Sequence, residues 1–303
     1  QGIKVADIIT KLKKGTVPTK AFEHSIPDWL VETLEKELGE NWEKEMIALN
    51  EQAPTILRAN SLKTSTKHLI EELKHENVES FQVPGFENAV QLEEKKNVFL
   101  TSAFKDGLFE VQDAGSQKIG EFLDVKPGMR VVDACAGAGG KTLHLAALME
   151  NKGQIIAMDI HGWKLAELKR RAKRAGAHNI ETREITDNKV IKRLHEKADR
   201  LLIDAPCSGL GVLKRNPDSK WKIDQDFIDR IRKEQETILQ DYSKIIKKGG
   251  KMVYATCSIL PSENNEQVEN FLKNNPDFKL IKEEKVLPST GFDGFYMALI
   301  ERV

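Results

Sequence analysis

From about residue 107 to the end of the chain, short apolar runs alternate with segments whose hydrophobic residues recur at helical spacing. The apolar runs predict strands and the segments between them predict helices. Because strands joined by helices form parallel sheets, the pattern predicts an α/β fold with a doubly wound, mostly parallel, Rossmann-like sheet. The predicted strands are 129–137, 154–160, 180–187, 199–207, 251–258, 277–284 and 293–303, and the predicted helices are 141–150, 164–176 and 226–250.

The residues before this region follow a different pattern. Residues 1–48 predict a charged helical segment that places Leu30, Leu34 and Leu38 on one face. Residues 49–106 predict a small α+β module with a strand and turn in 53–65, an amphipathic helix over 64–76, a loop at 83–89 and a strand over 98–104. We therefore expect three regions, 1–48, 49–106 and 107–303. For the helix over 226–250 we expect a C-terminal cap at its final Lys-Lys-Gly-Gly.

Composition excludes several classes of protein. The formal net charge of the 303 residues is zero, so any contact with nucleic acid must come from local basic patches. No apolar run reaches the roughly 18 residues that a membrane helix needs. The three cysteines, Cys135, Cys207 and Cys257, are too few and too widely spaced for a disulfide framework, and none has zinc-ligand spacing. We expect no metal, a cytoplasmic setting and a monomer.

Unusual residues gather where the predicted strands end. The stretch "DACAGAGGKT" follows one strand, "DAPCSG" follows another, "TCS" follows a third, and Asp159 and Asp187 end two more. Ligands of open α/β sheets bind beyond these carboxyl ends. The glycine loop has the spacing of neither a dinucleotide fingerprint nor a phosphate-binding loop. It can approach a ligand with its backbone, or it can be a tight turn without one.

The two acidic strand ends suggest what such a ligand contains. An acid 19 residues beyond Gly140, such as Asp159, typically accepts hydrogen bonds from ribose hydroxyls. That feature is shared by dehydrogenases and by enzymes that use S-adenosylmethionine, and Asp159 can instead cap a helix. Asp187 can contact an adenine amino group or simply cap a turn.

Cys207 and Cys257 end neighbouring βα units, so both thiols can reach one cavity. A buried free cysteine is often only a small hydrophobic residue. Two of them beside Asp204 suit methylation at carbon 5 of a pyrimidine. That reaction needs a thiolate that adds to carbon 6, a polar group on the base edge and a group that assists elimination.

These motifs resemble the Sun/RsmB group of S-adenosylmethionine-dependent RNA cytosine-5 methyltransferases. The resemblance extends from "HSIPDWL" at 24–30, through "LRAN" at 57–60 and "VQDAGSQ" at 111–117, to the glycine loop, "DAPCSGLGVLKRNPDSKW", "YATCSILPSENNEQV" and the terminal "DGFYMALI". It implies that Cys257 is the nucleophile and that Cys207 helps to release the product. DNA cytosine methyltransferases instead use their Pro-Cys cysteine as nucleophile.

The resemblance also implies a cofactor site and places Asp204 near the methyl group and the target base. Many members have Ala-Pro where this chain has Gly137-Ala138. The residues implied to bind S-adenosylmethionine are Cys135, Ala136, Gly137, Ala138, Gly139, Gly140, Lys141, Asp159, Asp187 and Asp204.

RNA is the implied partner, most of all 16S ribosomal RNA, with the module at 49–106 resembling the RNA-recognition-like domain of the family. Transfer RNA, DNA and a non-catalytic assembly role remain as alternatives. We also expect an additional helical RNA-binding domain of this family to be missing upstream of the chain. The residues expected to contact RNA are Lys214, Arg215, Lys220 and Trp221, with the basic helix at 164–176; Arg58 and Asn60 either bind RNA or pack against the larger domain.

Overall fold

The computed structural model describes residues 19–303, and its larger sheet has seven strands. Their order is β10-β11-β9-β8-β5-β6-β7, and only β11 runs antiparallel to its neighbours. From β5 the chain first adds β6 and β7 on one side, and it then crosses over to add β8 and β9 on the other side. This reversal of strand order is a topological switch point next to β5. The predicted doubly wound sheet is confirmed. Its strands are β5 (Arg130–Asp133), β6 (Gln154–Asp159), β7 (Ile180–Glu184), β8 (Ala198–Asp204), β9 (Ile246–Thr256), β10 (Phe278–Val286) and β11 (Phe295–Arg302).

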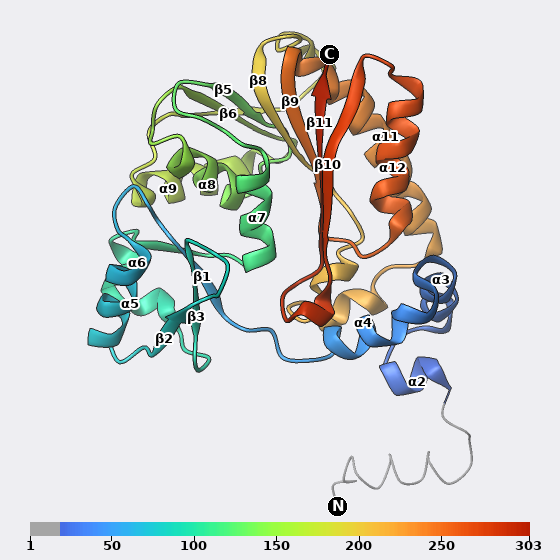
Figure 1. The fold of residues 1–303 in the computed structure, drawn as a ribbon, viewed down its shortest axis with the longest axis horizontal. Helices are drawn as coiled ribbons and strands as arrows, with labels where there is room; N and C mark the ends of the chain where they lie inside the picture. Colours follow the sequence, from blue (N-terminus) through green and yellow to red (C-terminus); the bar gives the residue numbers. More distant parts are fainter. Residues whose placement is uncertain (1–18) are drawn as a thin grey trace, which may run out of the picture.

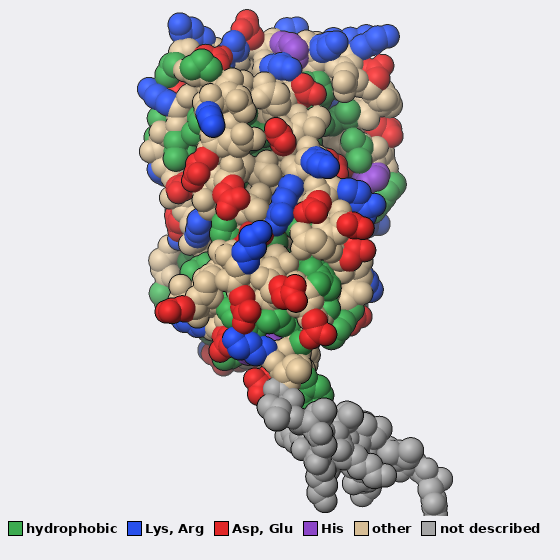
Figure 2. Space-filling view, turned by 90° about the vertical axis from the view of Figure 1, so that its right-hand side faces the viewer, with side chains coloured by type: hydrophobic (Ala, Val, Ile, Leu, Met, Phe, Trp, Pro, Cys, Tyr) green, Lys and Arg blue, Asp and Glu red, His purple; other side chains and the backbone are tan. Residues whose placement is uncertain are grey.

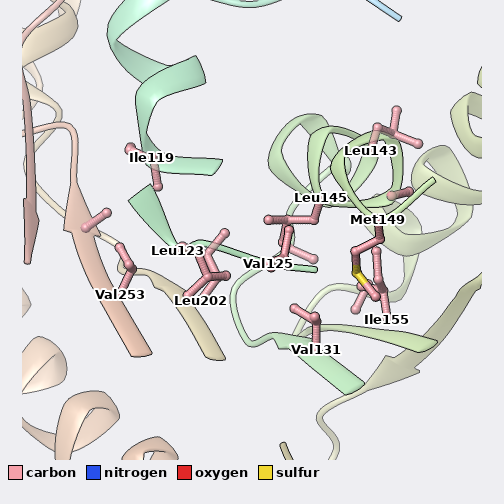
Figure 3. Packing of buried hydrophobic residues seen from close by; sticks show 14 of the residues in the cluster. Ile119, Leu123, Val125, Val131, Leu143, Leu145, Met149, Ile155, Leu202 and Val253 are labelled. Carbon is pink, nitrogen blue, oxygen red and sulfur yellow. The ribbon is translucent and has the colours of Figure 1, made fainter. Parts of the chain in front are cut away.

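Helices cover both faces of this sheet (Figure 1). Neighbouring strand residues point to opposite faces, so Val131 packs with one helix layer and Val132 with the other. Figure 3 shows the first layer, in which Leu143 and Leu145 of one helix and Ile119 of another lie over the strands. That layer consists of α7 (Ala114–Phe122), α8 (Gly140–Leu148) and α9 (Gly162–Ala175), and the other of α10 (Asn188–Lys192), α11 (Gln225–Tyr242) and α12 (Asn265–Asn274).

A smaller antiparallel sheet of order β2-β3-β1-β4 forms the module. Leu69 and Leu73 of its helix are fully buried, as the amphipathic pattern predicts. Its fourth strand lies beyond residue 106, so we propose that the module ends after Val111. The elements are β1 (Ile56–Ala59), α5 (Thr66–His75), β2 (Ser80–Gln82), β3 (Ala89–Leu92), the 3-10 turn η2 (Val98–Leu100), α6 (Ser102–Lys105) and β4 (Phe109–Val111).

The strand predicted over 98–104 is wrong, because these residues form η2 and α6. The side chain of Asn97 accepts a hydrogen bond from the backbone of Phe99, and the hydroxyl of Thr101 accepts one from Phe104. Each contact satisfies an amide at the start of a helical turn, which a strand cannot use. The apolar run is therefore helical, and Phe99 and Leu100 are exposed.

The helix predicted over 226–250 is too long, because α11 ends at Tyr242. The 3-10 turn η5 (Ser243–Ile245) follows, and β9 begins at Ile246. Ile245 and Ile246 are fully buried in the sheet core, so the Lys-Lys-Gly-Gly stretch belongs to the strand and caps no helix. Gly249 has a φ of +75°, and the register with β8 shifts between Ala198 and Arg200.

The N-terminal helical segment is confirmed from Lys20 onward, while residues 1–18 lie outside the described part. It is broken rather than continuous: α2 (Lys20–His24), α3 (Asp28–Leu38), the 3-10 turn η1 (Gly39–Asn41) and α4 (Trp42–Leu49). Gly39, with a φ of +56°, ends α3. Leu30 and Leu34 pack with Leu210 and Leu260, so these helices support the segments that follow β8 and β9. Within 19–303, no helix has the length and apolar character to cross a membrane.

Candidate active site at the carboxyl ends of the strands

The fold brings Cys207 and Cys257 into direct contact. Cys207 lies just after β8 and Cys257 just after β9, and their Sγ atoms are 3.3 Å apart. The backbone N–H of Cys257 also donates to Sγ of Cys207 at 3.3 Å. The hydrogen bond with Cys257 and burial raise the pKa of Cys207 well above its ordinary value. Cys207 therefore keeps its proton at neutral pH and can donate it to the sulfur of Cys257.

A partly buried ion pair lies in the same region. Nζ of Lys141, in the first turn of α8, is 2.7 Å from Oδ2 of Asp204 at the end of β8. Burial alone would lower the pKa of Lys141, but the charge of Asp204, with a smaller contribution from Cys257, raises it above its ordinary value. Lys141 is therefore a fixed positive charge that interacts with both groups.

A cavity of about 370 Å³ opens beyond β5, β6 and β8 and extends to α11. Its volume is that of a small-molecule site. Carboxylates and apolar side chains share its wall, so it can hold a ligand that is part polar and part apolar. It is lined by Ala134, Cys135, Gly137, Asp159, Ile160, His161, Lys164, Ile185, Asp204, Pro206, Glu234, Ile238 and Tyr242.

The glycine loop is held firmly at the edge of this cavity. Oδ2 of Asp159 accepts from the backbone N–H of Gly137 at 2.9 Å, and Oδ1 accepts from His161 at 2.8 Å. Gly139 has a φ of +89°, and a Cβ there would lie 2.5 Å from Leu168 of α9. Only glycine fits that position, which explains how the loop turns sharply into α8.

Asp187, predicted to contact an adenine, is exposed and is not among the residues that line the cavity. Its Oδ1 accepts from the backbone N–H of Lys189 at 2.7 Å, so it caps α10. The capping alternative is therefore what the structure contains. Sequence reasoning missed Ile160 and Ile185, although both stand one residue beyond a strand end, which is the signal that could have found them.

Three cations predicted to bind RNA are engaged within the protein. The side chain of Lys214 is 1% exposed and contacts the carbonyl of Pro288, and Nζ of the largely buried Lys220 donates to Oδ1 of Asn50. Arg215 forms ion pairs with Asp113 and Asp293. These internal contacts compete with phosphates for the three cations, and their binding to RNA stays a prediction. Trp221 is 58% exposed and remains a candidate.

Arg58 and Asn60 also have internal partners. Arg58 is buried and donates to the carbonyl of Gly140 at 2.8 Å, and Asn60 is buried and donates to the carbonyl of Ala175 at 2.8 Å. Both bonds join the module to the larger domain. The structure therefore contains the packing alternative, while contact of these two residues with RNA stays a prediction.

The surface has no single dominant charge on the face covered by α11, α12 and the N-terminal helices. Figure 2 shows that acidic and basic side chains of the described residues are interspersed there. On α9, Lys169, Arg170 and Lys173 are exposed, and Arg170 pairs with Glu167 at 2.6 Å. The exposed face of α9 therefore carries cations, one of them paired with an acid. Among residues 19–303, no group of three His, Cys, Asp or Glu side chains is placed to hold a metal ion.

Sequence reasoning also missed a buried polar network beneath the thiols. Ser208 and Ser258, each one residue after a cysteine, hydrogen bond to the carboxylate of Glu263. All three are buried. The repeated Cys-Ser pair in the two motifs is the only sequence signal for it.

Comparison with known proteins agrees with this geometry. Residues 121–300 match the family model described as 16S rRNA methyltransferase RsmB/F, and residues 26–99 match the RsmF/B-like ferredoxin-like domain. The probable ribosomal RNA small subunit methyltransferase B of Synechocystis sp. is 36% identical over 261 residues, which cover 85% of this chain and 58% of that relative. The chain thus spans less than two thirds of its length.

Two solved structures share the fold. The crystal structure of PH0851 has a TM-score of 0.90 and 30% identity over 97% of this chain and 71% of that chain. NSun6 from Pyrococcus horikoshii, solved with SFG, has a TM-score of 0.84 and 22% identity over 91% of this chain and 98% of that chain. The second likeness concerns the fold alone. The family model matches more than half of the residues of this chain, and this match shows that the chain belongs to the RsmB/F family of 16S rRNA methyltransferases.

Proposed function

We propose that this chain transfers a methyl group from S-adenosylmethionine to carbon 5 of a cytosine in RNA, most of all 16S ribosomal RNA. One observation carries the proposal: two thiols lie in contact beside a Lys–Asp pair, next to a cavity of the right size for the cofactor. A protein that only binds RNA needs neither thiol. Membership of the family points to small-subunit ribosomal RNA as the substrate.

The cavity fits the cofactor by the chemistry of its walls. Asp159 presents a carboxylate that can accept from ribose hydroxyls, and Ile160 and Ile185 offer apolar surfaces for an adenine ring. Asp204 lies on the side of the cavity that adjoins the thiols. SFG, found with the structurally similar NSun6 protein, is an analogue of S-adenosylmethionine. When bound, the cofactor supplies an electrophilic methyl group.

Cys257 acts as the nucleophile in this proposal. Its thiol gives up its proton to a base or water, and the resulting thiolate forms a bond to carbon 6 of the cytosine. The electron pair of the double bond between carbons 5 and 6 then becomes available at carbon 5, which accepts the methyl group. Lys141 favours this step because its positive charge attracts the charge that develops on the reacting groups. Asp204 is positioned to hold the polar edge of the base while the sulfur attacks.

Cys207 acts in product release. After methylation, carbon 5 loses its proton to a base or water, and the electron pair forms the ring double bond while the sulfur of Cys257 leaves. Cys207 holds its proton and lies 3.3 Å from that sulfur, so it can donate to the departing thiolate. Without this donor, release slows and the covalent adduct persists.

The target cytosine must be unpaired or flipped out, because carbon 6 in a duplex is out of reach of a thiol in this position. Trp221, further along the segment that follows Cys207, offers an exposed aromatic surface, and α9 offers cations for phosphates. Such contacts make binding dependent on salt.

Methyl transfer to purified 16S ribosomal RNA, transfer RNA and DNA, followed by bisulfite sequencing of the RNA, tests the proposal. We expect 5-methylcytosine in 16S ribosomal RNA, and we expect Cys257→Ala to abolish it. Methylation confined to transfer RNA would correct the substrate. Methyl groups on another atom, or full activity of Cys257→Ala, would contradict the chemistry.

A further inference from the structure

The carboxylate of Glu263 is fully buried directly behind the two cysteine segments. Its oxygens accept four hydrogen bonds: from Oγ of Ser208 at 2.5 Å, Oγ of Ser258 at 2.6 Å, the backbone N–H of Ser208 at 2.8 Å and Nε2 of Gln235 at 3.0 Å. Four donors fill the acceptor capacity of an ionised carboxylate. None of the donors is a cation.

These bonds connect two segments that are far apart in the sequence. Ser208 follows Cys207, and Ser258 follows Cys257, so Glu263 is bonded to the neighbour of each cysteine. The two hydroxyls also lie 3.1 Å apart. The carbonyl of Glu263 accepts from the hydroxyl of Tyr254 in β9 at 2.8 Å, which fixes the backbone that carries the carboxylate.

Placing a carboxylate here is costly for the fold. A buried charge without a cation loses its hydration, and apolar residues of similar volume fill such places more favourably. The arrangement therefore needs another explanation than stability. The geometry suggests one, because the carboxylate joins the only two segments whose separation sets the contact between the sulfur atoms.

We propose that Glu263 is a positioning residue that ties the Cys207 segment to the Cys257 segment and thereby fixes the approach of the two sulfur atoms. The inference rests on the proposed function for its meaning in catalysis, but the tie itself is a property of the folded chain. The charge of Glu263 is also among the causes that raise the pKa of Cys207, so it helps that thiol to keep its proton.

Two substitutions test the tie. Glu263→Gln keeps the shape and removes the charge, whereas Glu263→Asp keeps the charge and is too short to reach both hydroxyls. The matched control is Glu45→Gln, since Glu45 is also buried and accepts from the backbone and hydroxyl of Ser289, away from the cysteines.

The first readout is alkylation of Cys207 by iodoacetamide between pH 7 and pH 10, measured by peptide mass spectrometry. Loss of the tie weakens the contact with Cys257, which is the largest cause of the raised pKa of Cys207. We expect both Glu263 variants to alkylate Cys207 about threefold faster or more at pH 8, and Glu45→Gln to match the unmodified chain. This readout needs neither RNA nor cofactor, so it stands even if the proposed methylation fails.

The second readout is methyl transfer. We expect kcat to fall about 10²-fold in both Glu263 variants, with KM for S-adenosylmethionine within about twofold. The proposal is overturned if the folded variants show the alkylation profile of the unmodified chain. It is equally overturned if neither variant folds by circular dichroism, because Glu263 would then support the fold itself.

Discussion

The molecule contains two partly buried clusters of charged side chains that differ in the sign of the charge that is in excess. At the contact between module and larger domain, Glu110 is 4% exposed on its side chain and pairs with Arg171 at 2.8 Å and with Arg174. Around the cavity, the carboxylates of Asp159, Asp204 and Glu234 line the wall with one cation, Lys164. Lys141 pairs with Asp204, and the buried Asp133 interacts with both of them. In the first cluster two cations share one carboxylate, and these ion pairs hold the two domains together. An excess of carboxylates next to a cavity leaves hydrogen-bond acceptors free for a ligand. It also shifts the pKa values of the groups that share the site.

A large loss of stability is expected when the Glu110 cluster is broken. Glu110→Ala leaves two partly buried guanidinium groups without their partner, and we expect it to lower the free energy of unfolding by about 3 kcal/mol. Urea unfolding followed by circular dichroism measures the change. The control is Glu167→Ala, whose partner Arg170 is 79% exposed, and its cost should stay within about 0.5 kcal/mol. Equal costs for the two variants would show that the domain contact does not depend on Glu110.

The carboxylates near the cavity should make the stability of the folded chain depend on pH. Burial raises the pKa of Asp133, the hydrogen bond from Thr142 lowers it, and the charge of Asp204 raises it further. The resulting pKa is about 7. The folded state then binds a proton that the unfolded state releases near pH 4, so this group lowers stability as the pH rises from about 4 to about 7. We expect Asp133→Asn to be more stable than the unmodified chain at pH 8, by up to about 4 kcal/mol, and equal to it near pH 4.

Thermal unfolding at a series of pH values measures this difference. Asp124→Asn is the control, because the contact with Lys126 lowers the pKa of Asp124 and the change in stability should have the opposite sign. A difference between Asp133→Asn and the unmodified chain that does not vary with pH would contradict the account.

A smaller effect is expected on cofactor affinity. Asp159→Ala removes the acceptor proposed for the ribose and releases the backbone of Gly137, so we expect binding of S-adenosylmethionine to weaken about 10-fold to 100-fold. Binding of RNA should change little. Asp187→Ala, at the exposed cap of α10, should leave cofactor affinity within about twofold. Calorimetry that shows equal losses for cofactor and RNA would argue against the ribose contact.

The sequence predicts the larger sheet and the cavity edge well, because both depend on local signals. Apolar runs mark each strand, and the carboxyl end of each parallel strand lies at the same edge, so Cys207, Cys257 and Asp204 could be placed together. The helical form of 98–104 depends on caps from Asn97 and Thr101, which hydrophobic pattern alone does not reveal.

The basic residues show where sequence reasoning ends. Arg215 looks like a free cation in its own segment, but its partners Asp113 and Asp293 lie 102 and 78 residues away. The same holds for Arg58, whose acceptor Gly140 belongs to the other domain. Pairing between distant charges is a property of the tertiary structure, so local charge cannot tell an RNA contact from an internal one.

The central claim is that Cys257 attacks the base and Cys207 releases it. Incubation of each cysteine variant with 16S ribosomal RNA and S-adenosylmethionine, followed by a denaturing gel and mass spectrometry of the linked peptide, tests it most directly. We predict that Cys207→Ala accumulates a covalent protein–RNA adduct through Cys257, and that adding Cys257→Ala abolishes the adduct. An adduct that survives loss of Cys257 and requires Cys207 would contradict the account.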